Sequence, residues 1–184
     1  MEGLVIKSTG SWFLVKTSDN QLINCKIKGK FRLKVIKTTN PVAVGDRVEI
    51  ERPERQEAGV IKRIYPRHNH IIRKSTKLSK VSHIIAANID LALLVVTIRE
   101  PRITTGFIDR FLVTAEAYHI PAALVFNKID IYDKKDFDRL EELRGIYENA
   151  EYKTFGVSAL TGENVEKLKE EITGKVNLFS GVSG

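Results

Sequence analysis

A chain of 184 residues, 42% of them hydrophobic, is long enough for one ordinary domain or two small ones and apolar enough to bury real cores, as a soluble globular protein requires. No apolar run approaches the length of a membrane span, and the first residues lack the basic and apolar regions of a signal peptide, so we expect a cytoplasmic protein with no membrane partner. The net charge of +7 is unevenly divided, because residues 1–80 hold 18 Lys and Arg against 7 Asp and Glu, whereas residues 81–184 hold 12 against 16. This division indicates one module that meets a polyanion and another with a different role.

From Gly3 to about Tyr65 the pattern is that of strands. Five short segments rich in β-branched and aromatic residues are separated by turn residues; they are 4–7, 12–16, 22–27, 47–51 and 59–64. With the phrase VAVGDRVEI leading into the fourth, they resemble a five-stranded OB barrel of the S1 type, and we predict an all-β OB-fold RNA-binding domain over residues 1–66. Fold alone does not establish RNA binding. The only cysteine, Cys25, alternates with Ile23 and Ile27 and is expected at a buried strand position.

A basic stripe follows the third of these segments. Its cations alternate with apolar residues, so that in an extended backbone they share one face; they are Lys26, Lys28, Lys30, Arg32 and Lys34. We predict that this stripe binds RNA phosphates, and the alternative is an ordinary solvated face. Trp12, Phe13 and Phe31 are candidates for stacking on bases, although a small barrel more often uses aromatic residues as core.

Residues 67–82 are predicted to form a basic connector. They carry five Lys and Arg with Ser and Thr between them. His68 and His70 lie at its start, but no cysteine or acidic cluster is near enough to complete a metal site, and we predict none.

Residues 83–184 change to alternating strands and helices. Strands are predicted at 91–98, 122–126, 152–157 and 176–179, and the helical spacing of apolar residues predicts helices over about 107–118, 137–147 and 165–172. This repeated βα organisation implies an incomplete α/β domain with a mostly parallel sheet.

The first motif with chemistry is Asn127-Lys128-Ile129-Asp130, which follows the strand at 122–126. It matches the NKxD motif by which Ras-like GTPases select guanine. A carboxylate at Asp130 can accept the N1 and N2 hydrogens of guanine, a two-point contact that adenine cannot offer, while the Lys128 stem covers the purine and Asn127 ties the loop to its neighbours. Alone, the string also fits a strand-to-helix turn with Asn and Asp as local caps.

Two further motifs follow strands in the same way. Ser158-Ala159-Leu160 resembles the SAK/SAL loop of GTPases, in which a backbone amide near the alanine recognises guanine O6 and the serine braces the base loop. Gly181-Val182-Ser183-Gly184 resembles the first half of a P-loop, GxxxxGK[ST], whose Lys and Mg²⁺-binding Ser or Thr would lie beyond Gly184. A flexible small-residue tail is the alternative to the second assignment.

The order of the motifs identifies a family. NKID and SAL precede the P-loop start, whereas ordinary Ras-like GTPases have the P-loop first, so the order resembles a circular permutation. A basic OB-like domain ahead of a permuted GTPase resembles the ribosome small-subunit-dependent GTPase A family (YjeQ-like), and the phrases IIRKS, AANID, FIDRFLVTAE and PAALVFNKID extend the likeness over nearly the whole chain. On this resemblance, residues 83–184 are the N-terminal part of a circularly permuted P-loop GTPase domain.

The resemblance implies a GTPase stimulated by the small ribosomal subunit that assists late maturation of that subunit and contacts rRNA through its OB domain. It implies GTP or GDP and Mg²⁺ as ligands and a zinc domain outside these residues. We expect a monomer, although no motif in the sequence bears on oligomeric state. The P-loop Lys, the switch regions and the zinc ligands are not found in residues 1–184, so we expect this chain alone to be hydrolytically inactive and to contain no catalytic residue. The competing interpretation is a non-catalytic OB-fold RNA-binding module with a degenerate α/β scaffold domain.

Overall fold

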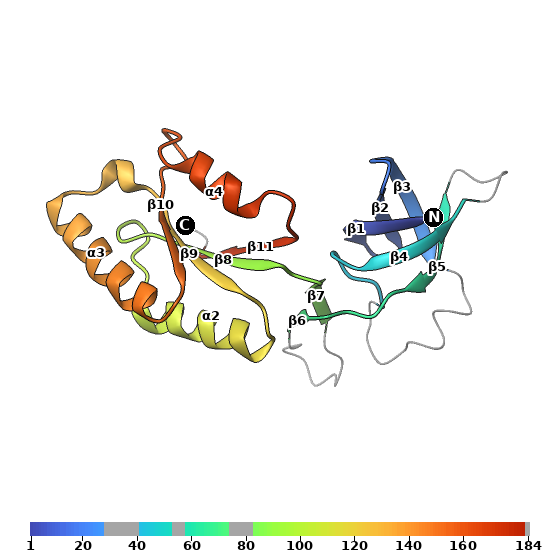
Figure 1. The fold of residues 1–184 in the computed structure, drawn as a ribbon, viewed down its shortest axis with the longest axis horizontal. Coiled ribbons are helices and arrows are strands. Elements are labelled where there is room, and N and C mark those ends of the chain that lie inside the picture. Colours follow the sequence, from blue (N-terminus) through green and yellow to red (C-terminus); the bar gives the residue numbers. More distant parts are fainter. Residues whose placement is uncertain (28–40, 53–57, 74–82, 183–184) are drawn as a thin grey trace. The chain divides into compact units, whose positions relative to one another are not determined.

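The structure is a computed structural model that describes residues 1–27, 41–52, 58–73 and 83–182. The chain divides into two compact units, Met1–Asn88 and Ile89–Gly184, which are described separately (Figure 1). Within the described ranges, no helix is both long and apolar enough to cross a lipid bilayer.

The first unit is built on a closed five-stranded barrel. Its strands are β1 (Glu2–Thr9), β2 (Trp12–Thr17), β3 (Leu22–Ile27), β4 (Arg47–Glu51) and β5 (Gly59–Ile64), in the order β1-β2-β3-β5-β4. Alternation decides what each strand buries: along β4, Val48 and Ile50 point into the core while Arg47, Glu49 and Glu51 are exposed. The predicted OB-like barrel is confirmed.

Cys25 lies in the barrel core, as the alternation in β3 predicted. Its side chain is fully buried, and burial raises the pKa of the thiol to about 11. The thiol is therefore protonated at neutral pH and packs as a small apolar group.

A hairpin that the sequence did not suggest adjoins the barrel. β6 (His70–Arg73) pairs antiparallel with β7 (His83–Ala87), although residues 70–73 were expected in a connector without strands. Val44, which precedes β4, bridges to Ala86, and the Ala87 N–H donates to the Val44 carbonyl at 2.9 Å. Both strands are short, and their apolar residues are adjacent and not alternating, so they give little local strand signal.

A buried ion pair lies near the contact between Val44 and the β6–β7 hairpin. The Asp46 side chain is fully buried and accepts hydrogen bonds from Arg67 at 2.6 and 2.7 Å and from the Ala43 N–H at 2.8 Å. Arg67 also donates to the Pro41 carbonyl at 3.0 Å. Because each Asp46 oxygen is paired, the buried charge is compensated and fixes residues 41–46 against the chain that follows β5.

The second unit is a four-stranded parallel sheet with helices on both faces. Its elements in chain order are β8 (Leu91–Val96), α2 (Thr105–Ala117), β9 (Ala122–Phe126), the short 3₁₀ helix η1 (Ile129–Ile131), α3 (Lys134–Asn149), β10 (Lys153–Gly156), α4 (Val165–Ile172) and β11 (Asn177–Gly181). The strand order is β10-β9-β8-β11, with every neighbouring pair parallel, which confirms the α/β prediction.

The central strands are apolar on both sides because both faces of the sheet are covered. Alternate residues such as Leu94 and Phe126 pack with α2 and α3, whereas Leu93 and Val125 pack with Leu168 of α4 (Figure 1). The sheet therefore presents its loops only at the ends of its strands.

Candidate functional site

The three motifs lie at one edge of the parallel sheet. NKID follows β9, SAL follows β10, and GVSG begins at the end of β11. Since the strands are parallel, their carboxyl ends share an edge, which is where open α/β sheets bind ligands. β9 and β11 are separated only by β8, so about 10 Å, two strand spacings, divides the base motif from the start of GVSG.

Hydrogen bonds join the NKID and SAL loops. The Asn127 Oδ1 accepts from the Ala159 N–H at 3.0 Å, and the Ile129 N–H donates to the Val157 carbonyl at 3.2 Å. The Asn127 N–H donates to the Val96 carbonyl of β8 at 2.8 Å, which fixes the start of the loop. Asn127 thus ties the loop to its neighbours in the way the motif predicts.

Lys128 is held in an unusual conformation. Its φ is +68°, in the left-handed region, and its ammonium donates to the Glu100 carbonyl at 2.6 Å. A left-handed residue other than glycine costs about 1 to 2 kcal/mol, so the surrounding bonds must hold it there. The lysine stem is consequently set in one direction along the edge of the sheet.

Asp130 is exposed within η1. Its side chain makes no ion pair or hydrogen bond inside the described ranges, so the carboxylate is left open to solvent. An uncommitted carboxylate on a fixed turn can accept two N–H donors from a planar ligand. Its predicted role at guanine stays a prediction.

The SAL loop is stabilised mainly by its own backbone. Ser158 is fully buried; its Oγ accepts from the Thr161 N–H at 3.1 Å and its carbonyl accepts from the Gly162 N–H at 2.9 Å. The hydroxyl therefore braces its own loop and not the NKID loop. The Leu160 side chain is 85% exposed, and its N–H has no partner in the described part of the chain, so this amide is open to a carbonyl acceptor.

A link that the sequence did not reveal supports the base loop from the other side. The Tyr132 hydroxyl donates to the Asn127 carbonyl at 2.8 Å and accepts from the Ile98 N–H at 2.8 Å. Burial, above all, raises the pKa of this hydroxyl, so it remains protonated and able to donate. Arg99 adds ion pairs to Asp133 and Asp136 at 2.5 and 2.8 Å. The only sequence signal was an aromatic residue just after the motif.

Tyr132→Phe should lower the stability of the second unit while the aromatic ring continues to fill its place in the core. Removal of the hydroxyl leaves the Ile98 N–H and the Asn127 carbonyl without their partner, which we expect to cost about 1 to 3 kcal/mol of unfolding free energy. Urea unfolding followed by helical circular dichroism measures it, since every helix of the described chain lies in the second unit. Tyr152→Phe, whose hydroxyl makes an exposed 3.2 Å bond to Glu116, is the control. Equal losses in both variants would contradict the bridging role.

Of the predicted start of the P-loop, Gly181–Gly184, the structure describes only the first two residues. Gly181 ends β11 beside β8, where an added Cβ would lie 2.9 Å from the Val95 carbonyl oxygen, so close packing of the two strands already favours glycine. Val182 is exposed, and Ser183 and Gly184 lie outside the described residues. The P-loop assignment of Gly181–Gly184 stays a prediction.

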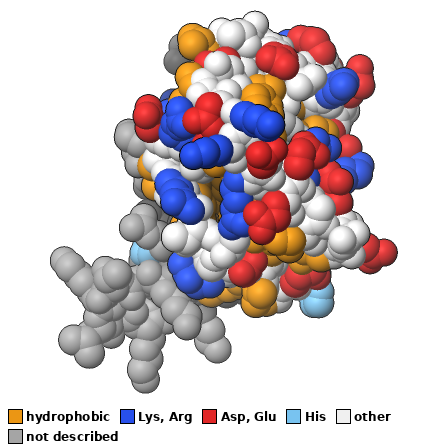
Figure 2. Space-filling model, turned by 90° about the vertical axis from the view of Figure 1, so that its left-hand side faces the viewer, with side chains coloured by type: hydrophobic (Ala, Val, Ile, Leu, Met, Phe, Trp, Pro, Cys, Tyr) orange, Lys and Arg blue, Asp and Glu red, His pale blue; other side chains and the backbone are white. Residues whose placement is uncertain are grey.

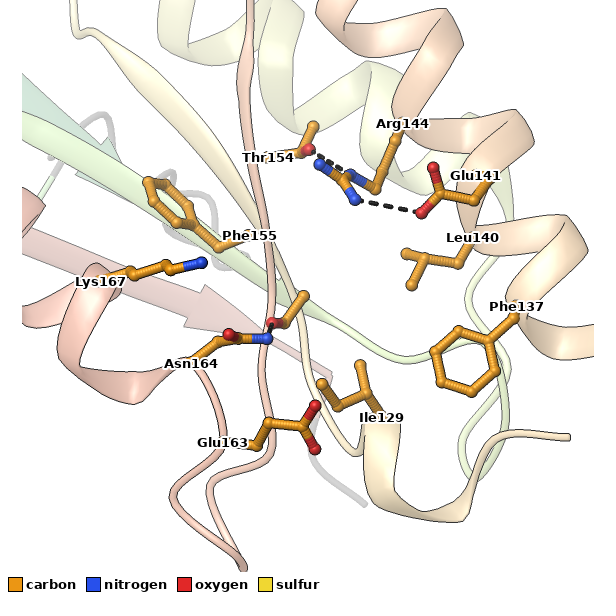
Figure 3. Close-up of a pocket in the computed structure, with 11 residues that line it drawn as sticks. Ile129, Phe137, Leu140, Glu141, Arg144, Thr154, Phe155, Glu163, Asn164 and Lys167 are labelled. Atoms are coloured by element: carbon orange, nitrogen blue, oxygen red, sulfur yellow. Dashed lines mark hydrogen bonds and ion pairs between the residues drawn. The ribbon is translucent and has the colours of Figure 1, made fainter.

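A cavity of about 270 Å³ lies elsewhere, between α3 and β10 (Figure 3). Leu140, Phe137 and Ile129 line it, and the Arg144 guanidinium at its rim is paired with Glu141 and Thr154. Of the predicted base loop only Ile129 reaches it; Asn127, Lys128 and Asp130 do not. The cavity is therefore separate from the predicted nucleotide site.

Charges on this side of the second unit are mixed. In Figure 2, basic and acidic side chains are interspersed. Along α3, basic and acidic residues form ion pairs such as Arg139–Glu142 and Arg144–Glu148. Exposed pairs of this kind contribute little stability and cancel one another's field. The face thus lacks the one-signed character of a polyanion surface.

The predicted RNA-binding stripe is described only at its first residue. Lys26 is exposed on β3, and its ammonium lies 4.0 Å from the centroid of the Trp12 ring. Lys28, Lys30, Arg32 and Lys34 lie outside the described residues, as does Phe31. Of the candidate aromatic residues, Phe13 is buried core whereas Trp12 is 42% exposed.

In comparisons with known proteins, both units match family models that are described as parts of RsgA. Residues 2–61 match the family described as RsgA N-terminal domain, and residues 64–184 match the family described as RsgA GTPase. The small ribosomal subunit biogenesis GTPase RsgA of Bacteroides fragilis is 55% identical over 184 residues, covering the whole chain and 59% of that protein. The Flavobacterium johnsoniae protein of the same name is 52% identical, with 57% of it covered.

Two solved structures are similar over the whole chain. YjeQ from Thermotoga maritima has a TM-score of 0.82 at 36% identity, and YloQ, described as a circularly permuted GTPase, has a TM-score of 0.78 at 27% identity. In each, 60% of the other chain is covered. The chain therefore spans about three fifths of the length of the proteins it resembles.

Proposed function

Since the chain belongs to the RsgA family of circularly permuted GTPases, we propose that the protein hydrolyses GTP when stimulated by the small ribosomal subunit and assists late maturation of that subunit. Relatives that match the whole chain carry small ribosomal subunit biogenesis in their names, which supports the extension. The proposal includes a cytoplasmic monomer. It also includes an OB domain at 1–66, a basic connector at 67–82 and the N-terminal part of the GTPase domain at 83–184.

The base of the nucleotide is assigned to the loops after β9 and β10. The observation that carries this assignment is the 3.0 Å hydrogen bond from the Ala159 N–H to Asn127 Oδ1, because it joins the two motifs into one rigid edge. On that edge Asp130 accepts the N1 and N2 hydrogens of guanine, the Lys128 stem covers the ring, and the free Leu160 amide donates to O6. Ser158 holds the amide in place through the bonds of its own loop.

The phosphates are assigned to the turn after β11, starting at Gly181. Phosphoryl transfer depends on positioning and on charge stabilisation by a P-loop lysine and Mg²⁺, which neutralises the phosphate oxygens. Residues 1–184 contain no complete GxxxxGK[ST] motif, and no described residue is assigned to Mg²⁺. We therefore propose that these 184 residues alone do not hydrolyse GTP and bind it weakly.

A turnover assay separates these proposals. The full-length protein should hydrolyse GTP slowly alone and faster with purified small subunits, whereas residues 1–184 should show no turnover above the buffer blank in either condition. Stimulated turnover by residues 1–184 contradicts the inactivity proposal. A full-length protein that binds rRNA but never hydrolyses GTP supports the alternative, a non-catalytic RNA-binding module.

A further inference from the structure

The barrel exposes the only tryptophan of the chain. Trp12 begins β2 and is 42% exposed, while the next residues of that strand that face inward, Phe13 and Val15, are fully buried. Packing of the core therefore does not require Trp12. Partly exposed tryptophan residues are enriched at surfaces that contact a binding partner.

A lysine from the neighbouring strand adjoins this ring. In the β2–β3 ladder Phe13 lies opposite Cys25, which brings Trp12 and Lys26 to the same outward surface. The Lys26 ammonium lies 4.0 Å from the ring centroid, a cation–π contact that holds the charge beside the ring. The two side chains therefore place a cation beside an aromatic ring on the outer surface of the barrel.

The surroundings of the pair are basic and apolar. β2 and β3 contain Lys16 and Lys26 and no acidic residue, and Leu22 on the same outward surface is 59% exposed. On the neighbouring strand β5, by contrast, Lys62 is paired with Glu51 of β4. The positive charge on β2 and β3 is therefore the less compensated of the two.

We propose that Trp12 and Lys26 form a stacking site for an unpaired base of RNA, with Trp12 against the base and Lys26 on the adjoining phosphate. Aromatic rings beside cations are the recurring way in which proteins hold single strands, and the face of strands 2 and 3 is where OB barrels place them. Bases within a duplex are already stacked, so the site selects single strands. The proposal rests on the RNA contact of the barrel that the proposed function includes.

The only tryptophan makes the test direct, because its fluorescence reports on one site. Residues 1–184 are titrated with a 12-nucleotide oligouridine and with a 12-base-pair RNA duplex. We expect saturable quenching of Trp12 by the single strand and little by the duplex. By fluorescence anisotropy of labelled oligouridine, Trp12→Ala should weaken binding by about tenfold, and Trp12→Phe should retain most of it.

Salt dependence distinguishes the two side chains. Trp12→Ala should leave the slope of log affinity against log salt unchanged, because no charge is lost. Lys26→Ala should reduce the slope by about 0.7, the value for one phosphate contact on a single strand. Leu22→Ala, an exposed apolar residue on the same surface, is the matched control and should bind normally.

The possible negative results of these binding experiments overturn different claims. Oligouridine that binds without quenching Trp12, and equally well to Trp12→Ala, overturns the stacking site while leaving RNA binding by the barrel intact. Equal affinity for the duplex overturns it as well. If neither the oligouridine nor small-subunit rRNA binds, both the stacking site and the RNA contact of the proposed function are wrong, whereas GTP turnover is unaffected.

Discussion

Gly45→Ala should destabilise the first unit by about 4 kcal/mol, enough to leave much of it unfolded. Gly45 has a φ of +89°, and an added Cβ would lie 1.9 Å from the Ala87 carbonyl oxygen, a backbone atom that cannot swing aside. The conformational strain costs about 1 to 3 kcal/mol, and the forced displacement of the hairpin adds a cost of similar size. Urea unfolding followed by Trp12 fluorescence measures the loss, because the only tryptophan lies in this unit.

Gly10→Ala is the matched control for strain without collision. Gly10 has a φ of +60°, but no atom lies within 4 Å of the position that its Cβ would occupy. We expect a loss of only about 1 kcal/mol there. Similar losses at the two glycines would show that the approach of Ala87 to Gly45 does not matter for stability.

Asp130→Asn should reverse the nucleotide preference of the full-length protein. The substitution removes a charge-assisted acceptor for two guanine hydrogens, and a loss of about 3 kcal/mol corresponds to about 100-fold weaker GDP binding. Xanthine carries a carbonyl where guanine carries its amino group, so the new amide can donate to it while its oxygen accepts the N1 hydrogen. Xanthosine diphosphate should therefore bind the variant more tightly than GDP does.

Competition against a fluorescent nucleotide measures both affinities. Asp138→Asn is the control, since it removes the same charge from an exposed residue of α3 whose side chain makes no hydrogen bond or ion pair in the described chain. It should leave GDP binding unchanged. An Asp130→Asn protein that still prefers GDP would falsify the base-reading role of the motif.

Much of the fold could be read from residue patterns. The bounds of β3, β4, β5, β9 and α4 agree with the predicted segments, because each has a clear local pattern: mainly alternating residues in β3, β4 and β5, a continuous apolar run in β9 and helical spacing in α4. β8 ends at Val96, two residues before the predicted end, because Thr97 and Ile98 leave the strand to enter the loop that contacts Tyr132. Local pattern does not register such a tertiary contact.

The candidate site was predictable in position but not in its connections. Asn127 and Ser158 could be placed because each follows a parallel strand, whose carboxyl end is where ligand loops lie. The tether from Lys128 runs to the backbone carbonyl of Glu100, and backbone acceptors carry no residue-type signal. The bridge through Tyr132 likewise joins two main-chain groups, so pattern reasoning had no means of detecting it.

The contacts of Val44 and Gly45 with residues 86–88 also limit the order in which a nascent chain can fold. Asn88 donates from its side-chain amide to the Gly45 carbonyl at 2.9 Å and accepts from the His68 N–H at 3.1 Å. Synthesis proceeds from the N-terminus, so Gly45 and Val44 can make these contacts only after more than forty further residues, up to Ala87 and Asn88, have left the exit tunnel. The first unit is therefore completed only after the β6–β7 hairpin emerges, and the α/β unit starts at the residue that follows Asn88.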